Sequence, residues 1–100
     1  MRKNLNNNKA RQSIKVFIEK NYPDRIEDIL LADGFDECLI GFTTNQAGNP
    51  VAVYDKQEMI KVIAKDLKID DCEALEYFDY NVECAYVGEY TPKYLDRYKQ

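Results

Sequence analysis

The sequence predicts an α+β fold: one small domain with an antiparallel β-hairpin, open to a third strand, covered by about four short helices. Three observations predict it. Apolar residues recur at steps of three and four on both sides of the middle of the chain, which is typical of amphipathic helices. Between them lie two short β-branched and aromatic runs around a loop rich in Asn, Gly and Pro, which is typical of a hairpin. The length of 100 residues, 45% of them hydrophobic, fits a single core.

The N-terminal third predicts an arm and two helices. Residues 1–9 are rich in Asn and basic, so we expect a mobile arm there and the folded domain over residues 10–100. Residues 10–21 place Ile14, Phe17 and Ile18 on one helical face. Pro23 suits the first turn of a second helix over Asp24–Ala32, with Gly34 just beyond its end.

The middle of the chain predicts the hairpin and a third helix. Cys38–Thr43 and Val51–Tyr54 are the two expected strands. A hairpin alone is marginally stable in water, so helices must cover one of its faces. Asp55, with Glu58 three residues later, predicts a capped helix start. The buried stripe of this helix is expected at Ile60, Ile63 and Leu67.

The stretch Ile69–Pro92 is the most distinctive part of the sequence. It holds seven carboxylates and four tyrosines, and neither Lys nor Arg. Asp70 and Glu73 form a capping-box pattern that begins a fourth helix. Its buried stripe is expected at Leu75, Phe78, Val82 and Ala85, which leaves an acidic, tyrosine-bearing face toward solvent. Beyond it, two alternatives stay open: a short helix over Lys93–Tyr98, or a strand at Ala85–Val87 that joins the hairpin.

Composition argues against several classes of function. The chain has no histidine, which removes the usual general base and the usual partner of a Ser or Cys nucleophile. Glycine spacing matches no phosphate loop, and no apolar run is long enough to span a bilayer. We therefore expect no enzymatic activity, no cofactor, no metal site and a cytoplasmic location. Three widely spaced cysteines are expected to be small buried residues.

Three segments carry a resemblance: DGFDECLIGF at Asp33–Phe42, VYDKQEMIKV at Val53–Val62 and EALEYFDYNVECAYVGEYTP at Glu73–Pro92. In this order they resemble a family of small proteins encoded widely in bacteriophage genomes, over about three-fifths of the chain. The family has no assigned activity or catalytic residues. The resemblance implies a phage or prophage origin and an accessory role. By analogy with small phage accessory proteins, it implies binding to a host protein such as a defence enzyme.

Charge is unevenly distributed and indicates where a partner would bind. The net charge of −4 combines +5 over residues 1–21 with −11 over residues 22–92. Tyrosines provide rigid contact area and carboxylates steer encounter with a basic surface. We therefore expect a host protein to bind an acidic face formed by Glu73, Glu76, Tyr77, Asp79, Tyr80 and Glu83. Such a face can also mimic nucleic acid, as a counter-defence, anti-CRISPR-like inhibitor would.

Two alternatives stay open beside this hypothesis. The basic N-terminal segment could bind nucleic acid through Lys3, Lys9, Arg11 and Lys15. Asn81 and Tyr86 could line a pocket that sequesters a small ligand, although Asn81 is also expected to satisfy backbone groups near the end of its helix. Self-association is compatible with each of the three.

Overall fold

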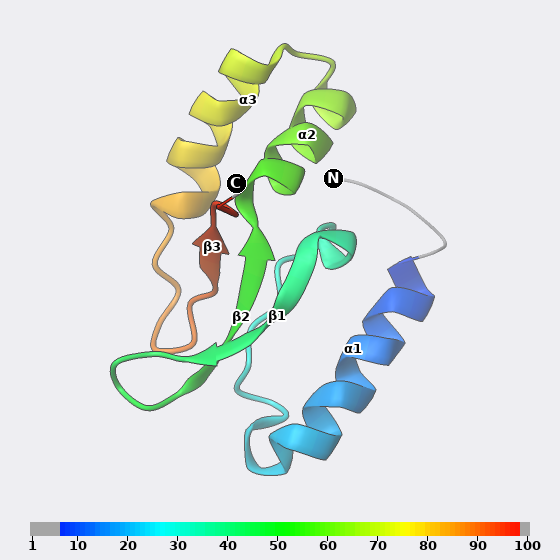
Figure 1. The fold of residues 1–100 in the computed structure, drawn as a ribbon, viewed down its shortest axis with the longest axis vertical. Helices are drawn as coiled ribbons and strands as arrows, with labels where there is room; N and C mark the ends of the chain where they lie inside the picture. The colour runs from blue at the N-terminus through cyan, green and yellow to red at the C-terminus, as the bar shows by residue number, and fades with distance from the viewer. Residues whose placement is uncertain (1–6, 99–100) are drawn as a thin grey trace.

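A mixed three-stranded sheet lies at the centre of the fold, with strand order β1-β2-β3. The computed structural model describes residues 7–98, which form this sheet and three α-helices (Figure 1). The α+β prediction is confirmed. The strands are β1 (Leu39–Thr44), β2 (Pro50–Asp55) and β3 (Lys93–Leu95); the helices are α1 (Asn7–Asn21), α2 (Lys56–Leu67) and α3 (Asp71–Phe78).

The predicted hairpin is present. β1 and β2 pair antiparallel, with Phe42 opposite Ala52 and an irregularity in register between Leu39 and Gly41. The side chain of Asn45 closes the connecting loop, because its Oδ1 accepts the backbone N–H of Asn49 at 2.9 Å. The turn chemistry of the loop therefore fixes the register of the two strands.

Both alternatives for the C-terminal segment were wrong. A third strand does join the hairpin, but it is Lys93–Leu95 and it runs parallel to β2. Tyr94 explains this position, because its ring packs against two buried aromatic rings: 6.2 Å from Tyr54 and 5.3 Å from Phe78 between centroids. Pro92 stands just before the strand, where the missing N–H costs no ladder hydrogen bond.

The expected helix over Asp24–Ala32 does not form. A single 3₁₀ turn at Pro23–Arg25 is followed by irregular chain up to a second such turn at Asp36–Cys38. Tertiary contacts explain the irregular path. The backbone N–H of Ala32 donates to the hydroxyl of Tyr54 at 2.7 Å instead of to a helical carbonyl. Gly34 has the expected left-handed φ, +85°, but no helix precedes it.

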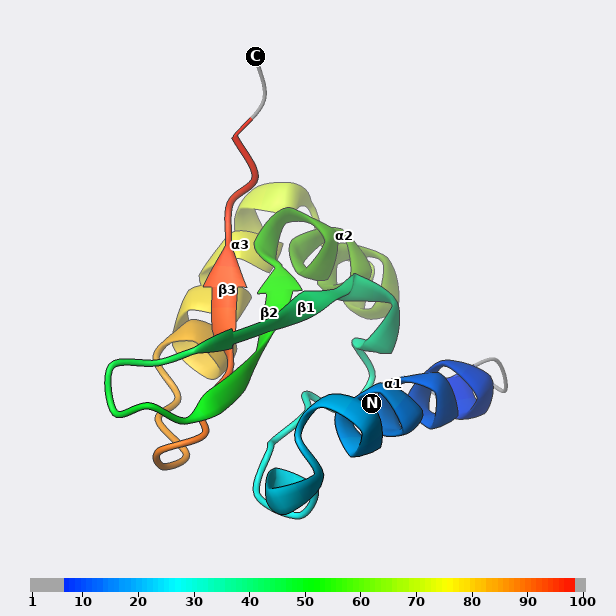
Figure 2. The same ribbon diagram turned by 60° about the horizontal axis from the view of Figure 1, so that its bottom comes forward.

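An ion pair holds α1 against the rest of the fold. Arg11 donates from Nε and a terminal nitrogen to the two carboxylate oxygens of Asp36, at 3.0 and 2.8 Å. Phe17 stacks on Phe42 with 5.3 Å between centroids, while Ile18 is the buried residue of the expected apolar face. Figures 1 and 2 show α1 on the β1 side of the sheet, away from α2 and α3. The helix begins at Asn7, within the expected arm; residues 1–6 lie outside the described residues.

The core joins one face of the hairpin to α2 and α3. Side chains from all three elements form its buried cluster: Ala52, Tyr54, Met59, Ile60, Ile63, Ala74 and Phe78. Both predicted N-caps are present: Asp55 accepts the N–H of Glu58, and Asp70 forms a full capping box with Glu73.

Several side chains expected in the core are exposed instead. The register of α3 turns Ala74 and Phe78 inward, which leaves Leu75 41% exposed and therefore outside the expected stripe. Leu67, near the end of α2, is 47% exposed. Ala85 is exposed because the helical segment ends before it. Of the cysteines, Cys38 is buried as expected, but Cys72 and Cys84 are exposed, so that expectation was wrong for two of three.

Truncation of α3 tests this register. Phe78→Ala should lower the free energy of unfolding by about 3–5 kcal/mol, because it removes a fully buried ring. Leu75→Ala should cost about 1 kcal/mol, since 41% of that side chain is exposed. Glu76→Ala should be close to neutral. Urea unfolding monitored by circular dichroism measures all three. A loss on Leu75→Ala equal to that on Phe78→Ala would contradict the register.

The attachment of α1 rests on one buried carboxylate. Arg11→Met should cost up to about 3 kcal/mol, because it leaves Asp36 buried without its partner; the partial exposure of Arg11 keeps the loss below that of a fully buried pair. Adding Asp36→Leu should restore much of the loss. Lys15→Met, one turn along the exposed side of α1, is the matched control. Stability that fails to recover in the double variant would count against a purely electrostatic tether.

Candidate functional site

The outer side of α3 carries the acidic face. Glu73, Glu76 and Tyr80 are exposed there, and Tyr80 has 84% of its surface in solvent. Glu73 also has a structural task, because its Oε1 accepts the N–H of Asp70 at 3.3 Å in the capping box. Among the described residues, the side chains of Glu76 and Tyr80 form no contact on which the fold depends.

Lys56 marks the edge of this face. Its Nζ lies 3.2 Å from Glu83, 3.9 Å from Asp96 and 5.5 Å from the centre of the Phe78 ring. Burial disfavours the charge on Lys56, but the hydrogen bond with Glu83 and the charges of Asp96 and Asp79 outweigh burial and raise its pKa. Glu83 and Asp79 therefore neutralise a lysine of the fold, and they contribute less free negative charge than the sequence indicates.

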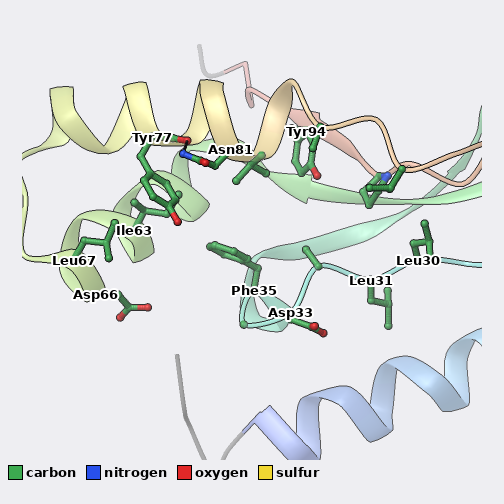
Figure 3. Close-up of a pocket in the computed structure, with 16 residues that line it drawn as sticks. Leu30, Leu31, Asp33, Phe35, Ile63, Asp66, Leu67, Tyr77, Asn81 and Tyr94 are labelled. Carbon is green, nitrogen blue, oxygen red and sulfur yellow. Dashed lines mark hydrogen bonds between the residues drawn. The ribbon is translucent and has the colours of Figure 1, made fainter. Parts of the chain in front are cut away.

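Tyr77 does not belong to the acidic face. It points into a groove of about 890 Å³ that lies between the α2–α3 pair and the irregular segment before β1 (Figure 3). The walls are mostly apolar, and the lining comes from four separate parts of the chain: Leu30–Phe35; Ile63, Asp66 and Leu67; Tyr77, Asn81, Val82, Ala85 and Val87; and Pro92 with Tyr94. This groove could not be located from the sequence, because no local spacing links those parts.

Asn81 lies where α3 passes into a π-helical turn, Asp79–Glu83. Its Nδ2 donates to the carbonyl oxygen of Tyr77 at 3.0 Å, so the expected role in satisfying a backbone group is confirmed. Asn81 also lines the groove, in agreement with the alternative that placed it in a pocket. Its expected partner Tyr86 is largely in solvent and lies outside the groove. π-helical turns often occur at functional sites, because they reorient one helical turn of side chains.

The charged side chains that line the groove are acidic. Asp33 and Asp66 are the charged residues of its lining, and Arg11 lies outside the lining but 3.5 Å from Asp33. Burial, with the charge of Glu83, raises the pKa of the Tyr94 phenol in the wall. The groove therefore offers apolar walls, tyrosine hydroxyl groups and acidic side chains. The oxygen atoms of these polar side chains accept hydrogen bonds from cationic donors more readily than they hold anions.

Of the residues expected to contact nucleic acid, three lie on α1. Lys3 lies outside the described residues. Arg11 is held by Asp36 and lies 3.5 Å from Asp33, so its guanidinium is not free for a phosphate. Lys9 and Lys15 are exposed on α1.

Across residues 7–98, no three His, Cys, Asp or Glu side chains come together as metal ligands would. Within the same range, no helix has the length and apolar character needed to cross a bilayer. Comparisons with protein-family models, with curated proteins and with solved structures find no match to this chain.

The hydroxyl of Tyr54 supports the groove wall at Ala32, and this can be tested by pH. Burial raises the pKa of Tyr54 to about 12, against about 10 for an exposed tyrosine. The folded state therefore keeps a proton that the unfolded chain releases above pH 10. Its stabilisation is complete below pH 10 and is lost as pH rises through 12, a fall of about 2–3 kcal/mol. Urea unfolding at pH 7, 9 and 11 measures the slope.

Tyr54→Phe provides the matching variant. At pH 7 it should cost about 1–3 kcal/mol, because the N–H of Ala32 loses its acceptor. The alkaline slope should shrink to what Tyr94 and Lys56, whose pKa values are also raised, contribute. Tyr98→Phe, at a solvent-exposed tyrosine, should leave both quantities unchanged. An unchanged slope in Tyr54→Phe would mean that another group carries the alkaline transition.

Proposed function

We propose that this chain is a non-enzymatic binding protein that engages a basic surface of a host protein through the outer side of α3. One observation carries the proposal: Glu76 lies on a helix capped at Asp70 and Tyr80 on the π-helical turn that continues it, and both are exposed, yet the fold uses neither side chain. Tyrosine is one of the residue types enriched among interface hot spots. The negative charge would speed encounter with a basic partner.

The origin and the kind of partner rest on the bacteriophage resemblance. On that basis we propose a phage or prophage accessory protein that acts in the host cytoplasm. Its partner would be a nucleic-acid-binding enzyme such as a defence nuclease, whose basic site would accept an acidic surface in place of nucleic acid. The engagement of Arg11 by Asp36 favours this proposal over direct binding to nucleic acid, because it removes one of the basic contacts.

Two substitutions on the acidic face test the proposal without disturbing the fold. The tagged protein is used to capture partners from lysate of a bacterial host at low salt. The double variant Glu76→Lys with Tyr80→Ala should lose the captured protein by at least tenfold, because it reverses one charge and removes one aromatic contact. Quantitative mass spectrometry measures the loss.

The matched control changes the same residue types elsewhere. Glu27→Lys with Tyr98→Ala alters an exposed acid and an 87% exposed tyrosine away from α3, and should keep full capture. The proposal would be overturned if both double variants captured the partner equally well. It would also be overturned if the amount captured were the same at low and at high salt. Glu83 is unsuitable for this test, since its reversal would also place two positive charges together at Lys56.

A further inference from the structure

We propose that the groove beside α3 binds a basic amphipathic segment of a protein partner, whose apolar side chains enter the groove and whose basic side chains meet Asp33 and Asp66. This inference rests on the proposed function for the existence of a partner, and it adds the segment of that partner that is recognised. The groove and the acidic face lie on neighbouring sides of one helix, because Tyr77 lines the groove and Glu76 lies on the outer face.

The shape of the groove favours a peptide. Figure 3 shows its lining side chains spread along the α2–α3 pair on one side and the segment before β1 on the other, from Leu67 at one end to Leu30 at the other. An elongated trough of this kind suits a helix or an extended segment that places several side chains in a row. A compact metabolite would leave part of such a trough in water.

The exposed apolar residues point the same way. Leu30, Leu67, Tyr77 and Val87 all line the groove, and each keeps between 37% and 57% of its surface exposed in the isolated chain. Apolar surface gathered in a concavity is characteristic of a binding site. Single exposed apolar residues occur elsewhere on this protein, such as Leu95 on β3, but Leu95 does not line the groove.

The charge of the groove and its surroundings indicates whether the bound segment is basic or acidic. The charged groups of the lining are acidic, and the adjoining face of α3 adds Glu73 and Glu76. Arg11 lies 3.5 Å from Asp33 but also pairs with Asp36, so two carboxylates share one guanidinium and the surroundings of the groove stay acidic. A segment with apolar side chains along one face and Lys or Arg on the others would satisfy both features. An acidic segment of equal hydrophobicity would meet like charges, which disfavours its binding.

A synthetic probe tests this inference without the natural partner. The probe is a 14-residue Leu/Lys peptide, LKKLLKLLKKLLKL, whose leucines lie on one helical face. A peptide of the same composition with the leucines spread around the helix is the first control, and the Leu/Glu counterpart of the probe is the second. Fluorescence anisotropy at about 0.15 M salt should give the probe an affinity at least tenfold higher than either control. Chemical shifts of the protein should change along residues 30–35, 63–67 and 77–87.

A matched pair of variants assigns the binding to the groove. Leu67→Ser should weaken the probe about tenfold, because a leucine contact with the apolar face is lost. Leu95→Ser changes a side chain that is 46% exposed, against 47% for Leu67, and should have no effect. Both residues are half in solvent, so both variants should fold.

Three outcomes would overturn the inference. Equal affinity for the two Leu/Lys peptides would indicate charge attraction alone. Shift changes confined to the outer face of α3, or to the sheet, would place the binding elsewhere. Concentration-dependent shifts at the groove without peptide, with a doubled mass in sedimentation, would assign the groove to a second copy of the chain. If the probe bound but no host protein were captured, the proposed function would be wrong and the inference about the groove would stand. Failure of the inference and failure of the proposed function are therefore distinguishable.

Discussion

The buried side chain of Tyr54 is the contact on which most of this fold depends. Its ring joins the hairpin to β3 through Tyr94, and its hydroxyl accepts the backbone N–H of Ala32. One residue thus fixes the parallel third strand and one wall of the groove. A phenylalanine could supply the packing but would leave that N–H without its acceptor, and a buried unsatisfied donor costs more than the hydrogen bond contributes. The chain between α1 and β1 is therefore held by tertiary contacts, and its regular secondary structure is limited to two 3₁₀ turns.

What the sequence could predict follows from how local each signal is. The starts of α2 and α3 were predictable because Asp55 and Asp70 cap helices through bonds that span three residues. The hairpin was predictable from its loop. The segment Asp24–Ala32 has helical spacing, yet it forms no helix, because the contact between Ala32 and Tyr54 joins residues 22 positions apart. Tyr94 was likewise assigned to the wrong elements, since its partners come from β2 and α3 and no periodicity records them.

The candidate site divides in the same way. The acidic face followed from helical spacing, and Glu73, Glu76 and Tyr80 are on the outside of α3 as expected. Tyr77 was assigned to that face and lies in the groove, because the helix buries Ala74 and not Leu75. A difference of one residue rotates a helical position by about 100°, enough to move a tyrosine from one surface to another. The spacing alone could not distinguish the two registers, since small Ala74 gave a weaker apolar signal than Leu75.

Placing charge and apolar surface on neighbouring sides of α3 has a physical consequence for binding. Long-range attraction by carboxylates mainly raises the association rate, whereas side chains buried in a groove mainly lower the dissociation rate. Lys56 limits the negative charge just beyond the end of α3, because it pairs with Glu83 and lies over the Phe78 ring. The acidic surface that is free to meet a partner is therefore centred on Glu76 and Tyr80, which do not pair with this lysine.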